Sequence, residues 1–536
     1  MHATQGALTR RVCFAALVAA GLVTPGLAPA QDADERMQQL EEQLKSVTDE
    51  LKAIKDQLRD ERDARIRSKA EDAGSKAAKD AAAASTQAAD LKDRLQALEQ
   101  RADQTPIGGL ANGLGLEDPR GRWAAKFTGR VQADYRYYDP ADAIPSTFSV
   151  RRARIGLDVA AFKYYNMYVE GEFITGNAQA GTTQGASLTN AYLDLNWFKE
   201  ARFRIGQFKP PISLENSAPD VLTDFMERGL TNSLIQNLNY DRGVMIQGVP
   251  YRGIYYGVSF TNGAGLNLEE RNTSAQDVGA RGKDVTARLA VNLAQYINFA
   301  DSVIHVGGSY KSGTVANSPT AGFVAASGRT EAFGTTFFTP QAFNGAGGVT
   351  QASNVDRSIA VGELALAWKQ FKLQGEYWKA QYSGTKVAPA PIVPYECDID
   401  SYYLAAFWMI TGEAYADAYG GNATFGRIKP RNNFSFEKGA GWGAWELGLR
   451  YSMFDASDFN NNASTANGTG RLGATAPTTV STNKAHAWTF MAKWIFNPYT
   501  RLLINYVDTD FATPVTTNGI SYSDEKAILF RGQFDF

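Results

Sequence analysis

The spacing of apolar residues changes at about Pro106. Before that residue, apolar side chains recur at the intervals of a helix seam; after it, they alternate with polar side chains at every second position. A period of two is typical of β-strands with one apolar and one polar face. The chain therefore predicts a helical segment followed by a large sheet. We count sixteen strand-like runs: Phe127–Tyr138, Val150–Ala161, Tyr164–Ile174, Leu188–Phe198, Arg202–Phe208, Gly243–Val249, Ile254–Thr261, Asp284–Leu293, Val303–Lys311, Ser358–Lys369, Phe371–Tyr382, Asp400–Ile410, Trp442–Phe454, Ala485–Phe496, Arg501–Thr509 and Glu525–Phe536.

The connections and the polar faces indicate how this sheet closes. Long polar loops alternate with tight breaks, as in outer-membrane barrels, and Thr411–Gly441 is a long connection where a short turn is due. Each strand has only one apolar face, and its polar face is rich in full charges, which a packed core cannot bury but a water-filled lumen can hold. We therefore expect an all-β transmembrane barrel of 16 antiparallel strands rather than a soluble sandwich or propeller.

The helical segment precedes the barrel. Residues 31–104 are charged and Ala-rich, and the early seam has the spacing of a coiled coil. Leu91, Leu95 and Leu98 repeat that spacing in another phase, so we expect a stutter between the two parts. A solvated single helix or a disordered linker is the alternative, and the sequence does not fix the number of helices in the coil. The early seam consists of Leu40, Leu44, Val47, Leu51, Ile54 and Leu58.

Residues 1–30 have the pattern of a secretory signal peptide. Arg10 and Arg11 precede the apolar run Val12–Val23, and Ala28-Pro29-Ala30 matches a cleavage site. The apolar run is shorter than the ~20 residues that a membrane-spanning helix needs. We expect export, a periplasmic helical segment at 31–104 and a barrel domain at 105–536.

Composition excludes several classes of protein. The chain has two cysteines, and Cys13 falls in the signal peptide, so neither a disulfide framework nor a Cys-based zinc site is expected. His305 and His486 are the histidines of the exported part, and neither lies near a recognisable nucleophile motif. We expect no enzyme activity, no metal and no cofactor.

The charged side chains of the predicted barrel balance one another. Residues 105–536 hold 38 basic and 38 acidic side chains, so the predicted barrel is formally neutral and shows no basic stripe for nucleic acid. Any preference for anions would need arginines at a constriction, where a low local dielectric amplifies a few charges. The polar strand faces carry charges of both signs, so the predicted lumen is not uniformly basic. These charged residues are Arg130, Asp134, Arg136, Arg152, Arg154, Glu170, Glu172, Asp194, Arg202, Arg204, Arg288, Lys372, Glu376, Glu446, Arg450, Lys493 and Arg531.

Several stretches together resemble the phosphate-selective porin O and P family of outer-membrane channels. They include GRVQADYRYYD at Gly129–Asp139, RRARIGLD at Arg151–Asp158, GAWELGLRYS at Gly443–Ser452, FNPYTRLLINYV at Phe496–Val507 and FRGQFDF at Phe530–Phe536. The resemblance implies a homotrimer of sixteen-stranded barrels in the outer membrane of a Gram-negative bacterium. It also implies that the third loop, about residues 210–241, folds inward as the constriction.

The resemblance assigns site residues position by position. The paired arginines of the family's second strand, which contact the anion, match Arg151 and Arg152; the third-strand carboxylate matches Glu172. Strict alternation turns only Arg152 inward, and a β-bulge or strand-end geometry would be needed to turn in Arg151. Other pore-lining candidates are Arg154, Arg204 and Arg228. A structural role is equally open for these arginines, which can pair with lumen carboxylates.

Two positions depart from the phosphate-selective pattern. An anion-coordinating arginine is replaced by Gln207, and although Arg288 matches the family's basic ladder, the ladder position four residues earlier is Asp284. The leading hypothesis is a passive channel for small anions such as phosphate. A general or sugar-type porin with little anion selectivity is the alternative, and an outer-membrane enzyme or adhesin is the third class. Expected partners are outer-membrane lipid and lipopolysaccharide, small anionic solutes, and peptidoglycan or a periplasmic partner through the coiled coil.

Overall fold

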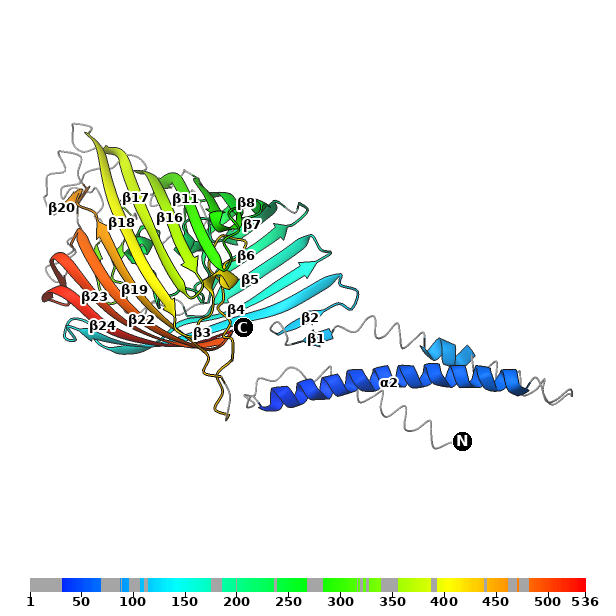
Figure 1. Ribbon diagram of the computed structural model, residues 1–536. Coiled ribbons are helices and arrows are strands. Elements are labelled where there is room, and N and C mark those ends of the chain that lie inside the picture. The colour runs from blue at the N-terminus through cyan, green and yellow to red at the C-terminus, as the bar shows by residue number, and fades with distance from the viewer. Residues whose placement is uncertain are drawn as a thin grey trace. The chain divides into compact units, whose positions relative to one another are not determined.

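The chain divides into two units, Met1–Thr105 and Pro106–Phe536 (Figure 1). The computed structural model describes residues 31–68, 87, 89–95, 107–109, 114–174, 186–198, 200–235, 239–267, 283–315, 317–318, 322–323, 327–338, 355–386, 393–437, 441–460, 470–471 and 482–536. The predicted signal peptide and Leu98 of the late seam lie outside these residues.

The first unit contains one long helix, α2 (Gln31–Ser68). Its 38 residues span about 57 Å at ~1.5 Å per residue. Leu44 and Val47 of the predicted seam are exposed, whereas Leu51, Ile54 and Leu58 are half-buried. Residues 89–95 are helical as well. The helical character agrees with the sequence pattern, and pairing into a coiled coil stays a prediction. No helix in the described ranges has the length and apolar character to cross a membrane.

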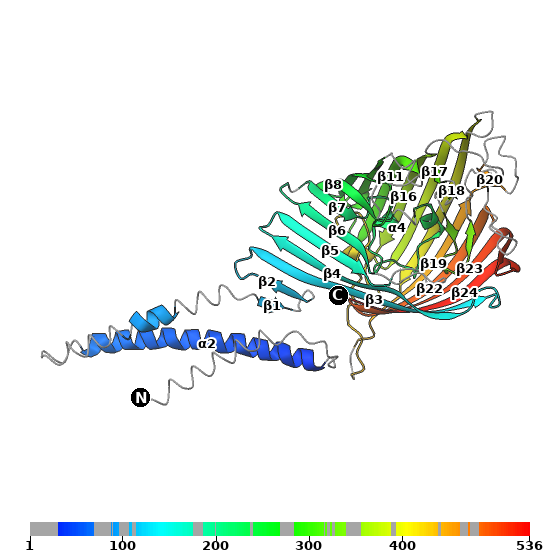
Figure 2. The same ribbon diagram turned by 180° about the vertical axis from the view of Figure 1, so that it is seen from behind.

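The second unit is a closed antiparallel barrel of sixteen strands, which confirms the predicted fold class (Figures 1 and 2). Each strand pairs with its neighbour along the chain, and β24 closes on β3. Every one of the sixteen predicted runs coincides with one strand. These are β3 (Trp123–Asp139), β4 (Thr147–Ala161), β5 (Tyr165–Glu172), β6 (Ser187–Leu195), β7 (Arg202–Phe208), β8 (Asp241–Tyr251), β9 (Ile254–Thr261), β10 (Asp284–Asn292), β11 (Ser302–Val315), β16 (Val355–Trp368), β17 (Phe371–Lys386), β18 (Val393–Met409), β19 (Ala444–Asp455), β22 (Lys484–Asn497), β23 (Thr500–Thr517) and β24 (Ile520–Asp535).

Short elements lie in the connections. Two strands before the barrel, β1 (Ile107–Gly109) and β2 (Gly115–Glu117), pair with each other, and β2 adds to the start of β3. The pattern did not predict them, because three residues are too few to show a period. The remaining elements are α4 (Leu214–Ser217), η1 (Leu230–Leu234), η3 (Leu293–Gln295), η4 (Tyr415–Ala418), β12 (Asn317–Ser318), β13 (Gly322–Phe323), β14 (Gly328–Arg329), β15 (Thr336–Phe338), β20 (Phe459–Asn460) and β21 (Gly470–Arg471).

Side-chain exposure alternates along the strands as the polar pattern requires. On β3, Val131 is 48% exposed and the next residue, Gln132, is fully buried. Outward positions carry large apolar side chains such as Ile155, Leu289 and Leu404, whereas the buried positions carry most of the charges. The apolar surface of the barrel therefore faces outward and the charged surface faces the interior, which is the reverse of the arrangement in a soluble protein.

Gly206 in β7 marks a tight approach between strands. Its φ is +131°, and a Cβ at this position would lie 2.2 Å from the carbonyl oxygen of Ala191 on β6. We expect Gly206→Ala to lower the folded fraction, because it combines backbone strain of about 1–3 kcal/mol with a clash against backbone. Refolding into detergent, followed on gels by the mobility of unheated samples, measures this fraction. Gly362→Ala is the matched control, since its Cβ would meet nothing within 4 Å; equal folding of both variants would contradict the expectation.

Candidate functional site

A β-bulge turns a second arginine toward the lumen. On β3 the partner of Gln132 is Arg152, but the partner of Ala133 is Val150, so Arg151 is the extra residue on β4. Regular alternation would point Arg151 at lipid, and the bulge releases it from that phase. Arg151 instead donates from Nε to Glu227 Oε1 (2.8 Å), inside the barrel. Of the two alternatives for this residue, the structure has the inward one.

The segment that follows β7, described at residues 209–235 and 239–240, packs inside the ring of strands (Figure 2). Its helix α4 places the backbone N–H of Glu215 2.7 Å from the carboxylate of Glu376 on β17. Asp224 pairs with Lys372 at the start of β17, at 2.8 Å. We call residues 209–235 together with 239–240 the inner loop. These contacts hold the inner loop against the barrel wall. In this position, carboxylates of the inner loop contact arginines of β3, β4, β19 and β24.

Asp220 of the inner loop is surrounded by four cations. Arg228 lies 2.6 Å from its carboxylate, and three further cations lie within 3.6 Å. Two of these, Arg152 and Arg154, come from β4, and Lys209 comes from the start of the inner loop. Burial tends to raise the pKa of Asp220, but the surrounding cations outweigh it and hold that pKa well below its usual range. Asp220 therefore stays ionised, and its single negative charge is too small to balance the four positive charges around it.

Glu227, which follows Asp220 in the inner loop, is shared by three arginines. Arg136, Arg151 and Arg531 approach it at 2.7, 2.8 and 2.9 Å. Burial tends to raise the pKa of Glu227, but the arginines outweigh it and hold that pKa well below the ordinary value. We call Asp220, Glu227 and the seven cations that contact them the inner-loop cluster. Those seven cations contact five carboxylates within the described residues, so the cluster has an excess of positive charge.

Water reaches only some of these cations. The side chains of Arg151, Lys209 and Arg152 are 19%, 16% and 10% exposed, whereas those of Arg136 and Arg531 are 5% and 1% exposed. Arg152 also has the weakest carboxylate contact of the seven, at 3.6 Å to Asp220, and its short hydrogen bond goes to the neutral amide of Gln132 (2.8 Å). Arg152 therefore keeps charge and donor capacity that its protein contacts do not saturate.

The other predicted site residues are held by protein groups. Arg154 and Glu172, two of the predicted site residues, form an ion pair with each other at 2.7 Å. Arg228 also donates hydrogen bonds to backbone carbonyls of the inner loop. Arg204 lies outside the cluster and makes a two-point contact with Asp194 (2.6 and 2.7 Å). Pairing with lumen carboxylates, the structural alternative, thus accounts for Arg204.

Gln207 and Arg288 also lie away from the cluster. Gln207 donates to Asn267 Oδ1 (3.0 Å) and accepts from Arg242 Nε (3.0 Å), so its amide is engaged on both sides. Arg288 has no exposed side-chain surface; it grips Glu363 at 2.8 Å and donates to the carbonyl of Ala423 (3.0 Å). In this structure the Arg288 side chain is therefore enclosed by protein groups.

Two further segments fold into the barrel, which the sequence analysis did not expect. In the connection between β11 and β16, Glu331 accepts from Arg450 (2.5 Å), and the ring of Phe333 lies 4.6 Å from the Arg151 guanidinium. The long connection after β18 also enters, with Tyr415 donating to Glu446 (2.6 Å). Loops have no hydrophobic period, so only the anomalous length of Thr411–Gly441 signalled this arrangement.

Lys372 joins two of the inward segments. Its Nζ contacts Asp224 of the inner loop and lies 4.3 to 4.9 Å from the ring centres of Phe407, Tyr415 and Phe425. A buried ammonium among three rings and one carboxylate gains both cation–π and ionic stabilisation. The inner loop and residues 415–425 are therefore fixed to the same strand.

Comparison with known proteins places this geometry in context. The model of a family described as phosphate-selective porin O and P matches residues 125–536. Three similar solved structures each align with 77% of this chain. A loop-deletion mutant of OmpT from Vibrio cholerae has 12% sequence identity and a TM-score of 0.43, and all of that chain is covered. The outer-membrane channel DcaP of Acinetobacter baumannii has 12% identity, a TM-score of 0.40 and 97% of its chain covered, and OmpF of Salmonella typhi in complex with daunomycin has 10% identity, a TM-score of 0.43 and 98% covered. No curated protein matches the chain.

Proposed function

Because this chain belongs to the phosphate-selective porin O and P family and is an outer-membrane channel protein, we propose that its barrel conducts small anions such as phosphate by passive diffusion. The observation that supports the proposal is the inner-loop cluster, in which seven cations contact only five carboxylates. Since the barrel sequence is neutral as a whole, this local excess is what would attract an anion and repel a cation.

The two departures from the phosphate-selective pattern bear on selectivity among anions. Asp284 pairs with Lys311 and Arg357, at 2.6 and 2.5 Å, so its negative charge is compensated and adds little repulsion. Gln207, in contrast, supplies no charge. We infer that the pathway favours anions in general, through Arg151, Arg152 and Lys209, and discriminates less among phosphate, chloride and carboxylates than an arginine at position 207 would allow.

Bilayer recordings distinguish this proposal from a general or sugar-type porin. In a potassium chloride gradient, the reversal potential of the purified channel is expected to have the sign of an anion-selective pore. Added phosphate is expected to reduce the chloride current, because both ions would occupy the same cations. A reversal potential near zero, with no effect of phosphate, would favour the general porin instead.

Lys209 makes a prediction about pH. Burial lowers the pKa of this loop lysine to about 7; Asp220 opposes the shift and Arg228 adds to it. The charge of Lys209 is therefore present below that pKa and absent above it, so anion selectivity should fall as the pH rises through neutrality. Lys209→Arg should remove this dependence, because arginine stays charged throughout. The reversal potential across a pH series measures it, and an identical pH profile in both proteins would contradict the assignment.

The assembly is also proposed to be a homotrimer. Between the exposed aromatic residues Phe148 and Tyr165, outward positions of β4 and β5 carry the aliphatic side chains of Ile155, Leu157, Met167 and Val169, and this aliphatic surface suits contact with a second barrel. The exposed seam residues of α2 would give the same trimer a coiled coil, through which it could reach peptidoglycan or a periplasmic partner. Native mass spectrometry of the full chain tests the stoichiometry, and a monomer at all concentrations would exclude the trimer.

A further inference from the structure

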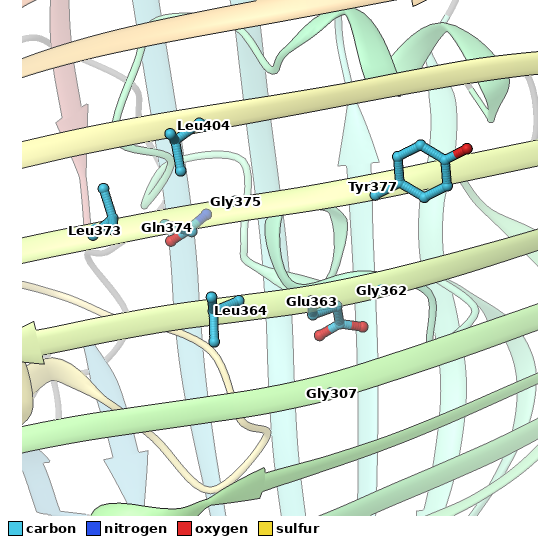
Figure 3. A pocket seen from close by; sticks show the side chains of 9 residues that line it. All are labelled: Gly307, Gly362, Glu363, Leu364, Leu373, Gln374, Gly375, Tyr377 and Leu404. Atoms are coloured by element: carbon cyan, nitrogen blue, oxygen red, sulfur yellow. The ribbon is translucent and has the colours of Figure 1, made fainter.

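The outer wall of the barrel has a notch where glycines replace side chains. The notch has a volume of about 410 Å³ and lies over strands β11, β16, β17 and β18 (Figure 3). Gly362 and Gly375 occupy outward positions there, and a Cβ added to Gly362 would meet no atom within 4 Å. The surrounding side chains of Leu364, Leu373 and Leu404 point away from the lumen. The floor of the notch is therefore formed largely by backbone, and its sides are apolar.

The open side of the notch faces the surroundings of the barrel. Leu364, Leu373, Tyr377 and Leu404 are 46%, 39%, 51% and 54% exposed. Glu363, which also lines the notch, has its carboxylate buried on the lumen side in the pair with Arg288. A solute inside the channel thus does not reach the notch, and its occupant must come from outside.

Two aromatic rows place the notch at a definite depth. Trp368, Phe371 and Trp408 form one row beside a short turn, and Phe371 stacks on Trp408 at 6.3 Å. Tyr377, whose partner on β18 is Tyr402, forms part of the other row, toward the opposite ends of these strands. Aromatic girdles mark the two interfaces of the hydrocarbon layer, and long connections mark the extracellular side.

A charged pair indicates where the hydrocarbon layer ends on the extracellular side. The next outward residue after Tyr377 on β17 is Lys379, which pairs with Asp398 at 2.6 Å and is 47% exposed. Such a pair belongs among head groups rather than acyl chains. The notch runs along β17 from Tyr377 to Leu373, so its upper end, next to Tyr377, lies at the level of the hydrocarbon of the outer leaflet.

We propose that this notch binds one acyl chain of a lipopolysaccharide molecule from the outer leaflet. The volume exceeds the ~30 Å³ of a water-sized group by an order of magnitude, so it can accept a run of methylene groups. A second copy of the chain is the competing occupant, but the two aromatic rows and the charged pair on this wall are features of a lipid-facing surface. Binding would rest on close packing, because lipid hydrocarbon is already as apolar as the leucines.

The test fills the notch and counts bound lipid. Full-length protein is mixed in detergent with purified rough lipopolysaccharide, and native mass spectrometry measures the lipid retained by the wild type, Gly362→Leu and Ala360→Leu. Ala360 is the matched control, since it is an outward residue of the same strand outside the notch. We expect Gly362→Leu to bind about three- to tenfold more weakly, the scale of one packing contact within a bilayer, and Ala360→Leu to bind as the wild type does.

Other outcomes would overturn the proposal. Equal retention by all three proteins would show that the notch holds no acyl chain, and loss of a phospholipid instead of lipopolysaccharide would assign the notch to another lipid. A change in oligomeric state with Gly362→Leu would assign it to a contact between copies. Leu404→Ala, which removes one side of the notch, gives a second measurement if the leucine variant folds poorly, and unchanged retention there would likewise contradict the proposal. Ion selectivity should be unaffected in every variant, so a failure here is separable from a failure of the proposed channel function.

Discussion

Replacing Arg152 with alanine is expected to reduce the ratio of chloride to potassium permeability about tenfold. A unit charge at ~4 Å contributes about 4 kcal/mol at an effective dielectric of 20, and partial hydration together with Asp220 would reduce this toward the ~1.4 kcal/mol of a tenfold change. Arg152 is chosen because water reaches it and its carboxylate contact, 3.6 Å to Asp220, is the longest in the inner-loop cluster. The measurement is the reversal potential in a potassium chloride gradient, with wild type and variant in the same bilayer.

Two variants control this experiment. Arg152→Lys keeps the charge but loses the paired donors, so it should retain most of the selectivity against potassium while weakening the block by phosphate. Arg204→Ala removes an arginine from the inner wall outside the cluster, where Asp194 already holds it, and should leave selectivity nearly unchanged. If Arg152→Ala behaves as Arg204→Ala does, the selectivity of the channel is set elsewhere.

Replacing Arg288 with alanine is expected to cost about 3–5 kcal/mol of stability, the usual consequence of removing one partner of a buried ion pair. Arg288 and Glu363 both have no exposed side-chain surface, and the substitution leaves the carboxylate facing His305 at 3.2 Å and Ser309 at 3.5 Å. It also removes the hydrogen bonds to the carbonyls of Asn422 and Ala423, which hold the long connection after β18. Urea unfolding in lipid vesicles, followed by tryptophan fluorescence, measures the loss.

The double variant Arg288→Leu with Glu363→Leu distinguishes a structural role from a role in conduction. Because it removes both charges together, it should recover much of the stability lost with Arg288→Ala. Reversal potentials should remain close to the wild type in both proteins, since a fully enclosed arginine does not meet the passing ion. A loss of anion preference with intact stability would instead return Arg288 to the pathway, as the family's basic ladder implies.

The sequence was a good guide to the barrel because its strands carry their own signal. Alternation such as Val131 against Gln132 repeats over many residues, and each repetition reports the same physical fact, that one face meets lipid and the other does not. The short strands β1 and β2 were missed because they are too short to show a period. The inward phases of Arg152, Asp194 and Arg288 followed from the same alternation.

The candidate site was only partly predictable. The partners of Arg152 and Arg151, Asp220 and Glu227, lie 68 and 76 residues further along the chain in a loop that has no periodic signal. The same holds for Lys209 and for Glu331, whose importance comes from loops that enter the lumen. Whether a lumen arginine is bound by protein carboxylates or left open to a solute depends on distances between segments far apart in the sequence. The pattern of apolar and polar residues does not contain these distances. The sequence therefore shows on which face of the barrel wall a residue lies, but it does not show which groups that residue contacts or what role it has.

The bulge at Arg151 has a consequence for how such channels can vary. On either side of it, Val150 points outward and Arg152 inward, so removal of Arg151 would leave the orientation of both neighbours unchanged. One extra residue in β4 thus places a cationic group inside the barrel without rotating the rest of the strand. Relatives that differ in charge selectivity are accordingly expected to differ at this point by the length of the strand as well as by its residue types.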